Sequence, residues 1–133
     1  MFGIKTRRLD RWLGDSSLAL HLYRIRELQA LYSLFQPELF LKANGIGHGP
    51  SGSYLSFCLW IRITFQVVYV ITVWGIDGPR IVGFAGLYNV QIGRSLGISL
   101  AIFKPEDRRR GYGRRTIELL LESLQANNVV NRV

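Results

Sequence analysis

Five arginines and two glycines lie within eight residues near the C-terminal end of the sequence, in the stretch "KPEDRRRGYGRRT". The arginines are Arg108, Arg109, Arg110, Arg114 and Arg115, and the glycines are Gly111 and Gly113. Guanidinium groups make charge-assisted and often bidentate hydrogen bonds to phosphate oxygens. Glycines allow a backbone turn to approach an anion with its N–H groups facing inward. These residue types at this spacing are typical of a phosphate-binding turn.

The turn precedes a segment with the pattern of an amphipathic helix, expected over Thr116–Ala126. Four apolar residues recur at intervals of three and four and predict its buried stripe: Ile117, Leu120, Leu121 and Leu124. A helix N-terminus carries unpaired amides and a partial positive charge, which both favour a bound phosphate. An exposed basic turn that happens to precede a helix would have the same pattern, and the motifs GxxxxGK[ST] and GxGxxG are absent. Both readings stay open on these residues alone.

The segment before the turn predicts an antiparallel sheet. Within residues 54–103, a turn at Gly75–Pro79 separates two strands, and a third strand covers Ser95–Phe103. The apolar run Tyr54–Trp74 is long enough to span a membrane. Arg62 and Gln66 in its interior, together with its many β-branched and aromatic residues, favour strands instead.

The first 53 residues predict a short strand, helices and a loop. Weak alternation near residues 4–9 allows a strand. Asp15 or Ser16 would cap a helix over Leu18–Phe35, which Pro37 ends or follows with a second short helix. The segment Asn44–Ser53 is rich in glycine, proline and serine and is expected to be a loop.

The composition is that of one globular domain. The chain has 133 residues, of which 48% are hydrophobic and 20% charged. Its net charge of +8 would suit a nucleic acid, but five of the 17 basic residues lie in the one turn, which indicates a local site more than a basic face. The single cysteine, Cys58, is expected to be a buried thiol within an apolar run. With no signal-peptide pattern, these features favour a cytoplasmic protein.

The stretch "SLGISLAIFKPEDRRRGYGRRTIELLLESL" resembles the coenzyme-binding core of the GNAT N-acetyltransferase superfamily. The family signature is Arg or Gln, two residues, Gly, one residue, then Gly or Ala, and Arg108, Gly111 and Gly113 occupy these positions. The resemblance covers about Val67–Val133 and is greatest to ribosomal-protein and small-molecule N-acetyltransferases. It implies one α/β domain with a mainly antiparallel sheet, two early helices on one face and the helix Thr116–Ala126 on the other.

The resemblance implies acetyl-CoA as the co-substrate and direct acetyl transfer to a primary amine, with no metal. Backbone amides of Arg109–Arg114 would hold the pyrophosphate, and the last strand would pair with the pantetheine arm. The implied coenzyme site comprises Ala101, Ile102, Phe103, Arg108, Arg109, Arg110, Gly111, Tyr112, Gly113 and Arg114. The alternative function is a small basic module that binds nucleic acid or phosphorylated ligands, with no catalytic activity.

No catalytic residue is assigned from the sequence. The strand Ser95–Phe103 contains no carboxylate, and Glu106 and Asp107 after it are expected to be solvated turn residues. His48 in the glycine-rich loop is a better candidate base than His21, which would lie on the polar side of the first helix. Other candidates near the expected cleft are Tyr88 and Asn89.

Members of the GNAT superfamily continue past this helix with a splayed strand, a further helix and two closing strands. This sequence ends at Val133, where the splayed strand would begin. The segment that follows in the family often contributes a tyrosine that protonates the departing thiolate. The resemblance therefore predicts a truncated chain with weak or no activity, or a homo-oligomer such as a dimer paired through Val129–Val133.

Overall fold

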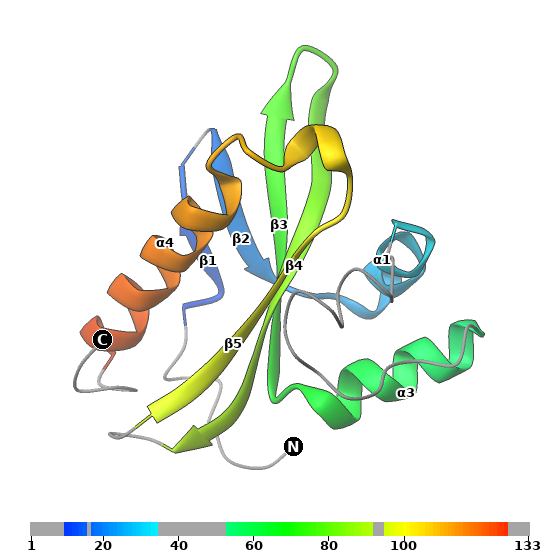
Figure 1. Ribbon diagram of the computed structural model, residues 1–133, viewed down its shortest axis with the longest axis vertical. Helices are drawn as coiled ribbons and strands as arrows, with labels where there is room; N and C mark the ends of the chain where they lie inside the picture. Colours follow the sequence, from blue (N-terminus) through cyan, green and yellow to red (C-terminus); the bar gives the residue numbers. More distant parts are fainter. Residues whose placement is uncertain (1–9, 16, 35–52, 92–94, 128–133) are drawn as a thin grey trace.

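The computed structural model describes residues 10–15, 17–34, 53–91 and 95–127, whose strands form one antiparallel sheet (Figure 1). Each strand pairs with the next along the chain, in the order β1-β2-β3-β4-β5. The strands are β1 (Trp12–Gly14), β2 (Leu18–Leu22), β3 (Val67–Gly75), β4 (Gly78–Gln91) and β5 (Ser95–Ile102). The predicted antiparallel strands over Val67–Phe103 and their turn at Gly75–Pro79 are confirmed.

The segment Leu18–Phe35, predicted as one helix, is divided among three elements. Leu18–Leu22 is strand β2, Ile25–Glu27 is the 3-10 helix η2, and Leu28–Leu34 is the helix α1. The leucines of "LALHL" recur at every second residue as well as every fourth, so their spacing fits both a strand and a helix. Pairing with β3 decides in favour of the strand. The helix prediction was therefore wrong for the first part of this segment.

Asp15 accepts hydrogen bonds within the turn between β1 and β2, and does not cap a helix as predicted. Its carboxylate accepts hydrogen bonds from the hydroxyl and backbone N–H of Ser17 and from the N–H of Leu18, at 2.7, 2.8 and 3.2 Å. These bonds, led by that from the Ser17 hydroxyl, lower the pKa of Asp15 to about 2. Gly14, with a φ of 107°, makes the β1–β2 turn possible.

Tyr54–Thr64 forms the helix α3, although its residues predicted a strand. The Ser53 hydroxyl caps this helix by accepting a hydrogen bond from the Ser56 N–H at 3.0 Å. Phe57, Trp60 and Ile61 are buried at intervals of three and one residues along one helical face. Packing of these large side chains against α1 and the sheet outweighs the weak local preference for a strand. Cys58 is partly exposed, not buried as expected.

Two apolar clusters lie on opposite faces of the sheet. Tyr69 and Ile71 of β3 face the helix α4 (Tyr112–Ala126), whereas Val68 and Val70 face α1 and α3. Successive strand residues point to opposite faces, so β3 supplies both clusters. The predicted placement of an early helix, α1, on one face and the C-terminal helix on the other is confirmed. The second helix of the first face is α3, which lies in a segment predicted as strand.

The buried stripe of α4 is rotated from the predicted one. Leu120 and Leu124 are buried as expected, and their burial contributes about 1.5–3 kcal/mol each. Ile117 is 37% exposed, because the helix turns that position away from the sheet. The other buried positions of the stripe are Thr116, Leu119 and Ser123.

Several predictions fall outside the described residues. They are the first strand near residues 4–9, the short helix after Pro37, the loop over 44–52 and the pairing of Val129–Val133. Over the ranges that the structure describes, no helix is both long and apolar enough to cross a membrane.

Candidate anion-binding turn between β5 and α4

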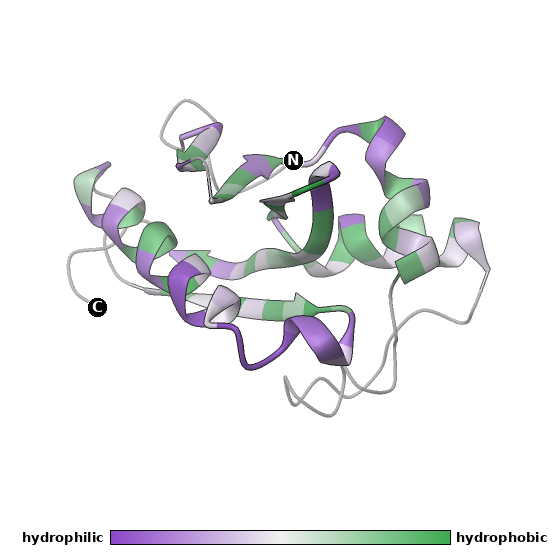
Figure 2. Cartoon of the chain, turned by 90° about the horizontal axis from the view of Figure 1, so that it is seen from above, coloured by the Kyte–Doolittle hydropathy of each residue, from purple (hydrophilic) through white to green (hydrophobic). Residues whose placement is uncertain are grey.

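The arginine-glycine stretch forms the connection from β5 to α4. After β5 the chain makes the 3-10 helix η3 (Pro105–Asp107), a turn over Arg108–Gly111, and then α4. Figure 2 shows this connection as a hydrophilic segment that leads into the helix. The arginines therefore lie at the N-terminus of a 15-residue helix, where the helix dipole favours an anion.

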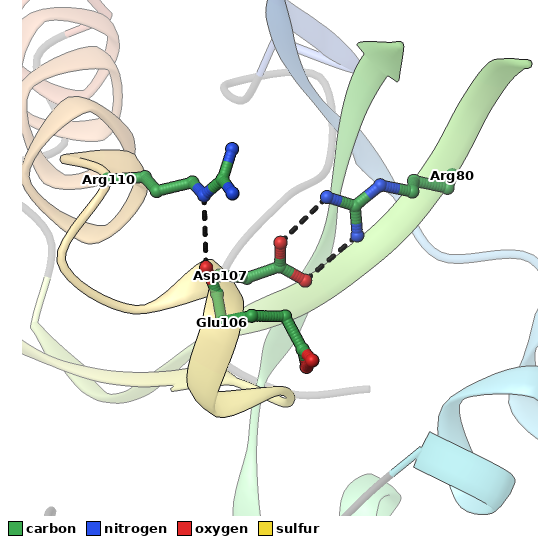
Figure 3. A network of polar contacts seen from close by, with 4 residues as sticks. All are labelled: Arg80, Glu106, Asp107 and Arg110. Carbon is green, nitrogen blue, oxygen red and sulfur yellow. Dashed lines mark hydrogen bonds and ion pairs between the residues drawn. The ribbon is translucent and has the colours of Figure 1, made fainter. Parts of the chain in front are cut away.

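A partly buried ion pair attaches η3 to the sheet (Figure 3). The guanidinium of Arg80, near the start of β4, donates two hydrogen bonds to the Asp107 carboxylate at 2.7 and 2.8 Å. Asp107 is 1% exposed, and its hydrogen bonds from Arg80 are the main reason that its pKa lies below the ordinary value. Asp107 was expected to be a solvated turn residue and is not, whereas Glu106 is exposed as expected.

Arg108 is also committed to the fold. Its Nε donates to the Ile102 carbonyl at 2.9 Å, and its Nη2 donates to the Phe103 carbonyl at 3.0 Å. These two bonds fasten the turn to the end of β5. Arg110 makes a looser attachment, because its Nε donates to the Glu106 carbonyl at 3.0 Å while the residue stays exposed.

The two glycines have different roles. Gly111 is the N-cap of α4 with a φ of 78°, and a Cβ built there meets nothing within 4 Å. Gly113 is the second residue of α4, and a Cβ there would come within 2.8 Å of the Leu100 Cδ2 of β5. Gly111 thus permits the left-handed backbone of an open turn, and Gly113 permits close packing of α4 on β5.

The backbone of Arg109 is also left-handed, with a φ of 68°. A non-glycine residue in this region stores conformational strain, which is commonest at ligand-binding turns. Arg109 is exposed, and so is Arg114, whose side chain is 87% exposed and only 3.9 Å from Glu118. The first amides of α4, from Tyr112 to Arg114, have no carbonyl one turn earlier in the helix to receive them. Two exposed guanidinium groups and these amides can together bind a phosphate or pyrophosphate.

The backbone N–H and C=O groups of Ala101, Ile102 and Phe103 do not all face the same side of the strand. The Ala101 carbonyl oxygen lies against Gly83 of β4, where a Cβ would approach it to 1.9 Å. The Phe103 N–H donates to the Val82 carbonyl at 2.9 Å. Ile102 lies between these residues, so it directs its backbone groups to the opposite edge of β5. In the described part of the sheet, β5 is a terminal strand and no other strand pairs with this edge, where Arg108 binds the Ile102 carbonyl.

The candidate catalytic side chains do not meet at this turn. His48 lies outside the described residues. His21 belongs to β2 rather than to the polar side of a helix, and its Nε2 lies 2.7 Å from the Glu27 carboxylate. Tyr88 and Asn89 are near the end of β4, where the Tyr88 ring lies against Gly97 of β5 and Asn89 has a φ of 50°.

Sequence reasoning missed Arg80, whose contribution to the turn depends on a contact with a residue 27 positions away. No pattern within the segment containing Arg80 indicates this pairing. The alternation of β4 shows only that the residue is near a strand end. The ion pair of Asp107 could not be predicted from the sequence either, because charged residues in a turn are usually solvated.

Comparisons with known proteins indicate the fold. No protein-family model and no curated protein sequence matches the chain. A solved domain from Methanocaldococcus jannaschii DSM 2661 is similar, with a TM-score of 0.68 and 17% identity over 84% of this chain and 72% of that one. A "putative acetyltransferase" from T. thermophilus has a TM-score of 0.67 and 13% identity over 96% of this chain and 64% of that one. A further "putative acetyltransferase" has a TM-score of 0.67 and 14% identity over 98% of this chain and 65% of that one.

These similarities show that the chain has an acetyltransferase-like fold of the α+β class. The chain spans just under two thirds of the length of the two acetyltransferase-like structures. At identities of 13% and 14%, the similarity concerns the fold alone.

Proposed function

We propose that the turn between η3 and α4 binds the pyrophosphate of acetyl-CoA, and that the chain transfers the acetyl group to a primary amine of a protein N-terminus or a small molecule. The arrangement of the turn is the observation that carries this proposal. Asp107 and Arg108 fix it to the sheet, while Arg109 and Arg114 stay exposed beside the amides of a helix N-terminus. The similarity to acetyltransferase-like folds supports the same reading.

The coenzyme would extend from this turn along the unpaired edge of β5. Amides of Arg109–Arg114 would hold the pyrophosphate, with Arg109 and Arg114 adding charge. The pantetheine arm would pair with the strand edge at Ile102 through the N–H that faces away from β4, because the Ile102 carbonyl on that edge already accepts a hydrogen bond from Arg108. Ala101 and Phe103 would then border the arm, and Arg108 would support the site through its bonds to the strand.

In the proposed reaction, the lone pair of an unprotonated amine attacks the thioester carbonyl carbon. The carbon–sulfur bond breaks, CoA departs and takes up a proton as the thiol, and the amine nitrogen loses a proton to give the amide. The protein contributes by holding the two reactants together and by placing a strand amide near the carbonyl oxygen. No described side chain is assigned as the acid or base.

Calorimetry with CoA and with a short DNA duplex tests the proposed ligand. We expect CoA to bind and to protect the chain against heat, and equal inorganic phosphate to protect it less. Replacing Arg109 and Arg114 together by Ala should weaken CoA binding about a hundredfold, since each charged contact contributes about 1.5 kcal/mol or more. Arg26→Ala is the matched control, because Arg26 is an exposed arginine on η2.

Tight binding of the duplex with a steep loss at higher salt, and no preference for CoA, would instead identify a nucleic-acid module. Release of the CoA thiol from acetyl-CoA, measured with and without a panel of primary amines, tests the reaction. Binding of CoA without any amine-dependent thiol release would contradict the proposed transfer.

A further inference from the structure

A cavity of about 560 Å³ lies where α3 ends and β3 begins. Its volume is within the range of about 300–1,000 Å³ that is usual for small-molecule sites. Ile61, Phe65 and Val68, three of its lining residues, belong to the apolar cluster under α1 and α3. The cavity is therefore continuous with the face of the sheet that these helices cover.

The polar residues of the cavity are Tyr23, Arg62 and Gln66, and none of its lining residues is acidic. Gln66 is committed to the fold, because its side-chain oxygen accepts a hydrogen bond from the Val90 N–H at 2.7 Å. Among the described residues, neither the Arg62 guanidinium nor the Tyr23 hydroxyl has a hydrogen-bond or ion-pair partner. The cavity thus combines apolar walls with a cation that lacks a counter-ion and a second available donor.

The cavity is one strand away from β5. A Cβ at Gly86 of β4 would lie 2.4 Å from the Phe65 ring, so this ring rests directly on the Gly86 backbone. Gly86 is paired in register with Ser99 of β5, and directly opposite residues present their side chains on the same face. The cavity wall formed by Phe65 is therefore a neighbour of the strand that would hold the coenzyme.

Ser99 adds a separate observation on this face. It is 1% exposed, and its hydroxyl oxygen has no hydrogen-bond partner among the described residues. A buried hydroxyl without a partner costs free energy, and a bound ligand and an ordered water are two ways in which such a group is satisfied. This hydroxyl lies on the same face as Phe65, between the cavity and the unpaired edge of β5.

We propose that the cavity is the acceptor site of the transferase, and that the acceptor is a small amine whose apolar body carries a carboxylate paired with Arg62. The apolar walls would hold the body, and the Tyr23 hydroxyl is the second donor for the carboxylate. The amine would then face Phe65 and β5. This inference rests on the proposed function, because only a transferase needs an acceptor.

Titration of the isotope-labelled full chain with phenylacetate, followed by NMR, tests the cavity without requiring turnover. Phenylacetate combines an apolar ring with a carboxylate, and phenylacetamide is the uncharged analogue of the same shape. We expect phenylacetate to shift the amide signals of Val67 and Val68, and phenylacetamide to bind about tenfold more weakly. The variant Arg62→Gln should lose this preference, whereas Arg26→Gln should keep it.

Equal binding of the two probes, unchanged phenylacetate binding in Arg62→Gln, or no binding of phenylacetate would each overturn the inference. Arg62 is exposed, so its replacement should leave the folded spectrum intact. The variant Arg62→Lys keeps the charge and should retain part of the preference, which separates loss of charge from loss of structure.

Adding CoA to the same sample separates this inference from the proposed function. We expect CoA to shift the amides of Arg109–Arg114 while phenylacetate stays bound at Val67 and Val68. Displacement of phenylacetate by CoA would place the probe in the coenzyme site and contradict an acceptor cavity. If phenylacetate binds and CoA does not, the proposed function fails while the carboxylate-binding cavity stands.

Discussion

Four of the arginines around the β5–α4 connection form two groups that differ in what their guanidinium groups contact. The inner group, Arg80 and Arg108, bonds to a buried carboxylate and to strand carbonyls. The outer group, Arg109 and Arg114, is exposed, and among the described residues its one ion pair is the long contact of Arg114 with Glu118 of the same helix, at 3.9 Å. The same residue type thus fixes the turn on one side and leaves charge available for a ligand on the other.

This difference determines which property each substitution should change. A guanidinium that satisfies buried acceptors contributes to stability, because its removal leaves those acceptors unpaired. An exposed guanidinium contributes little to stability, because water solvates it equally well in the unfolded chain. Substitutions in the inner group should therefore change the free energy of unfolding, and those in the outer group should change binding.

The largest loss of stability is expected for Arg80→Ala. This change leaves the Asp107 carboxylate buried without its partner, which we expect to reduce the free energy of unfolding by about 2 kcal/mol. The figure is below that for a fully buried pair, because the Arg80 side chain is 46% exposed and solvent screens it. Urea unfolding at pH 7 measures the change. Arg115→Ala removes a looser surface pair with Asp15 at 3.8 Å and should cost much less stability than Arg80→Ala.

The same pair predicts how stability depends on pH. The pKa of Asp107 is lower in the folded chain than its ordinary value of 3.8, so the carboxylate stabilises the fold above that value. This contribution should disappear as the pH falls below 3.8 and through the lowered pKa of the folded state. The difference in stability between the wild type and Arg80→Ala should therefore shrink on acidification. A difference that stays constant as the pH is lowered from neutral through 3.8 would show that the pair is not the cause.

The second effect is expected for Arg108→Ala, at about 1.5 kcal/mol. The loss is that of two charge-assisted hydrogen bonds to the carbonyls of Ile102 and Phe103, partly replaced by water. Arg114→Ala is the matched control from the outer group and should change the free energy of unfolding by less than about 0.5 kcal/mol. If the two variants lose equal stability, the division into two groups is wrong.

The sequence predicted the elements whose signals are local. The hairpin around Gly75–Pro79 is bounded by turn residues, and the helix over Thr116–Ala126 follows its own apolar period, so neither needs knowledge of the rest of the chain. Leu18–Leu22 becomes a strand only because β3 is beside it, and Tyr54–Thr64 becomes a helix through contacts of its aromatic side chains. The Ser53 cap is a local signal that favours the helix.

The residues of the candidate site also differ in whether their positions can be predicted from local sequence. Gly111 and the run of arginines are adjacent in sequence, and their spacing predicted their common position at a helix N-terminus. The separation of this run into inner and outer residues could not be predicted, because Arg80 joins the turn from another strand. Which guanidinium reaches the carbonyls at the end of β5 depends on which backbone groups of that strand face away from β4. The register of the β4–β5 pairing sets this.

The third prediction compares the two glycines of the turn. Gly111→Ala forces an alanine into a φ of 78°, which should cost about 1 kcal/mol of stability. In Gly113→Ala, the new methyl group meets only the movable end of Leu100, and alanine favours the helix by about 0.5–1 kcal/mol. Thermal unfolding should therefore show a clear loss for the first variant and a change near zero for the second. Equal losses would mean that crowding under α4, and not backbone conformation, limits both positions.

The smallest expected effect is a gain, in the variant Thr116→Val. Thr116 is fully buried in α4, and its hydroxyl oxygen has no hydrogen-bond partner among the described residues. Valine has nearly the same shape and removes the unpaired hydroxyl, so we expect the free energy of unfolding to rise by about 0.5–1 kcal/mol. CoA binding should not change, because the residue faces the core and not the outer arginines.

Ser123→Ala in the same helix is the matched control, since the Ser123 hydroxyl donates to the Asp10 carboxylate. Its loss should destabilise the chain by about 1 kcal/mol, opposite in sign to Thr116→Val. A loss of stability in Thr116→Val would reveal a partner for that hydroxyl. A loss of CoA affinity in Thr116→Val without a loss of stability would instead show that the buried side of α4 also affects binding. The division into inner residues that stabilise the fold and outer residues that bind would then not hold along this helix.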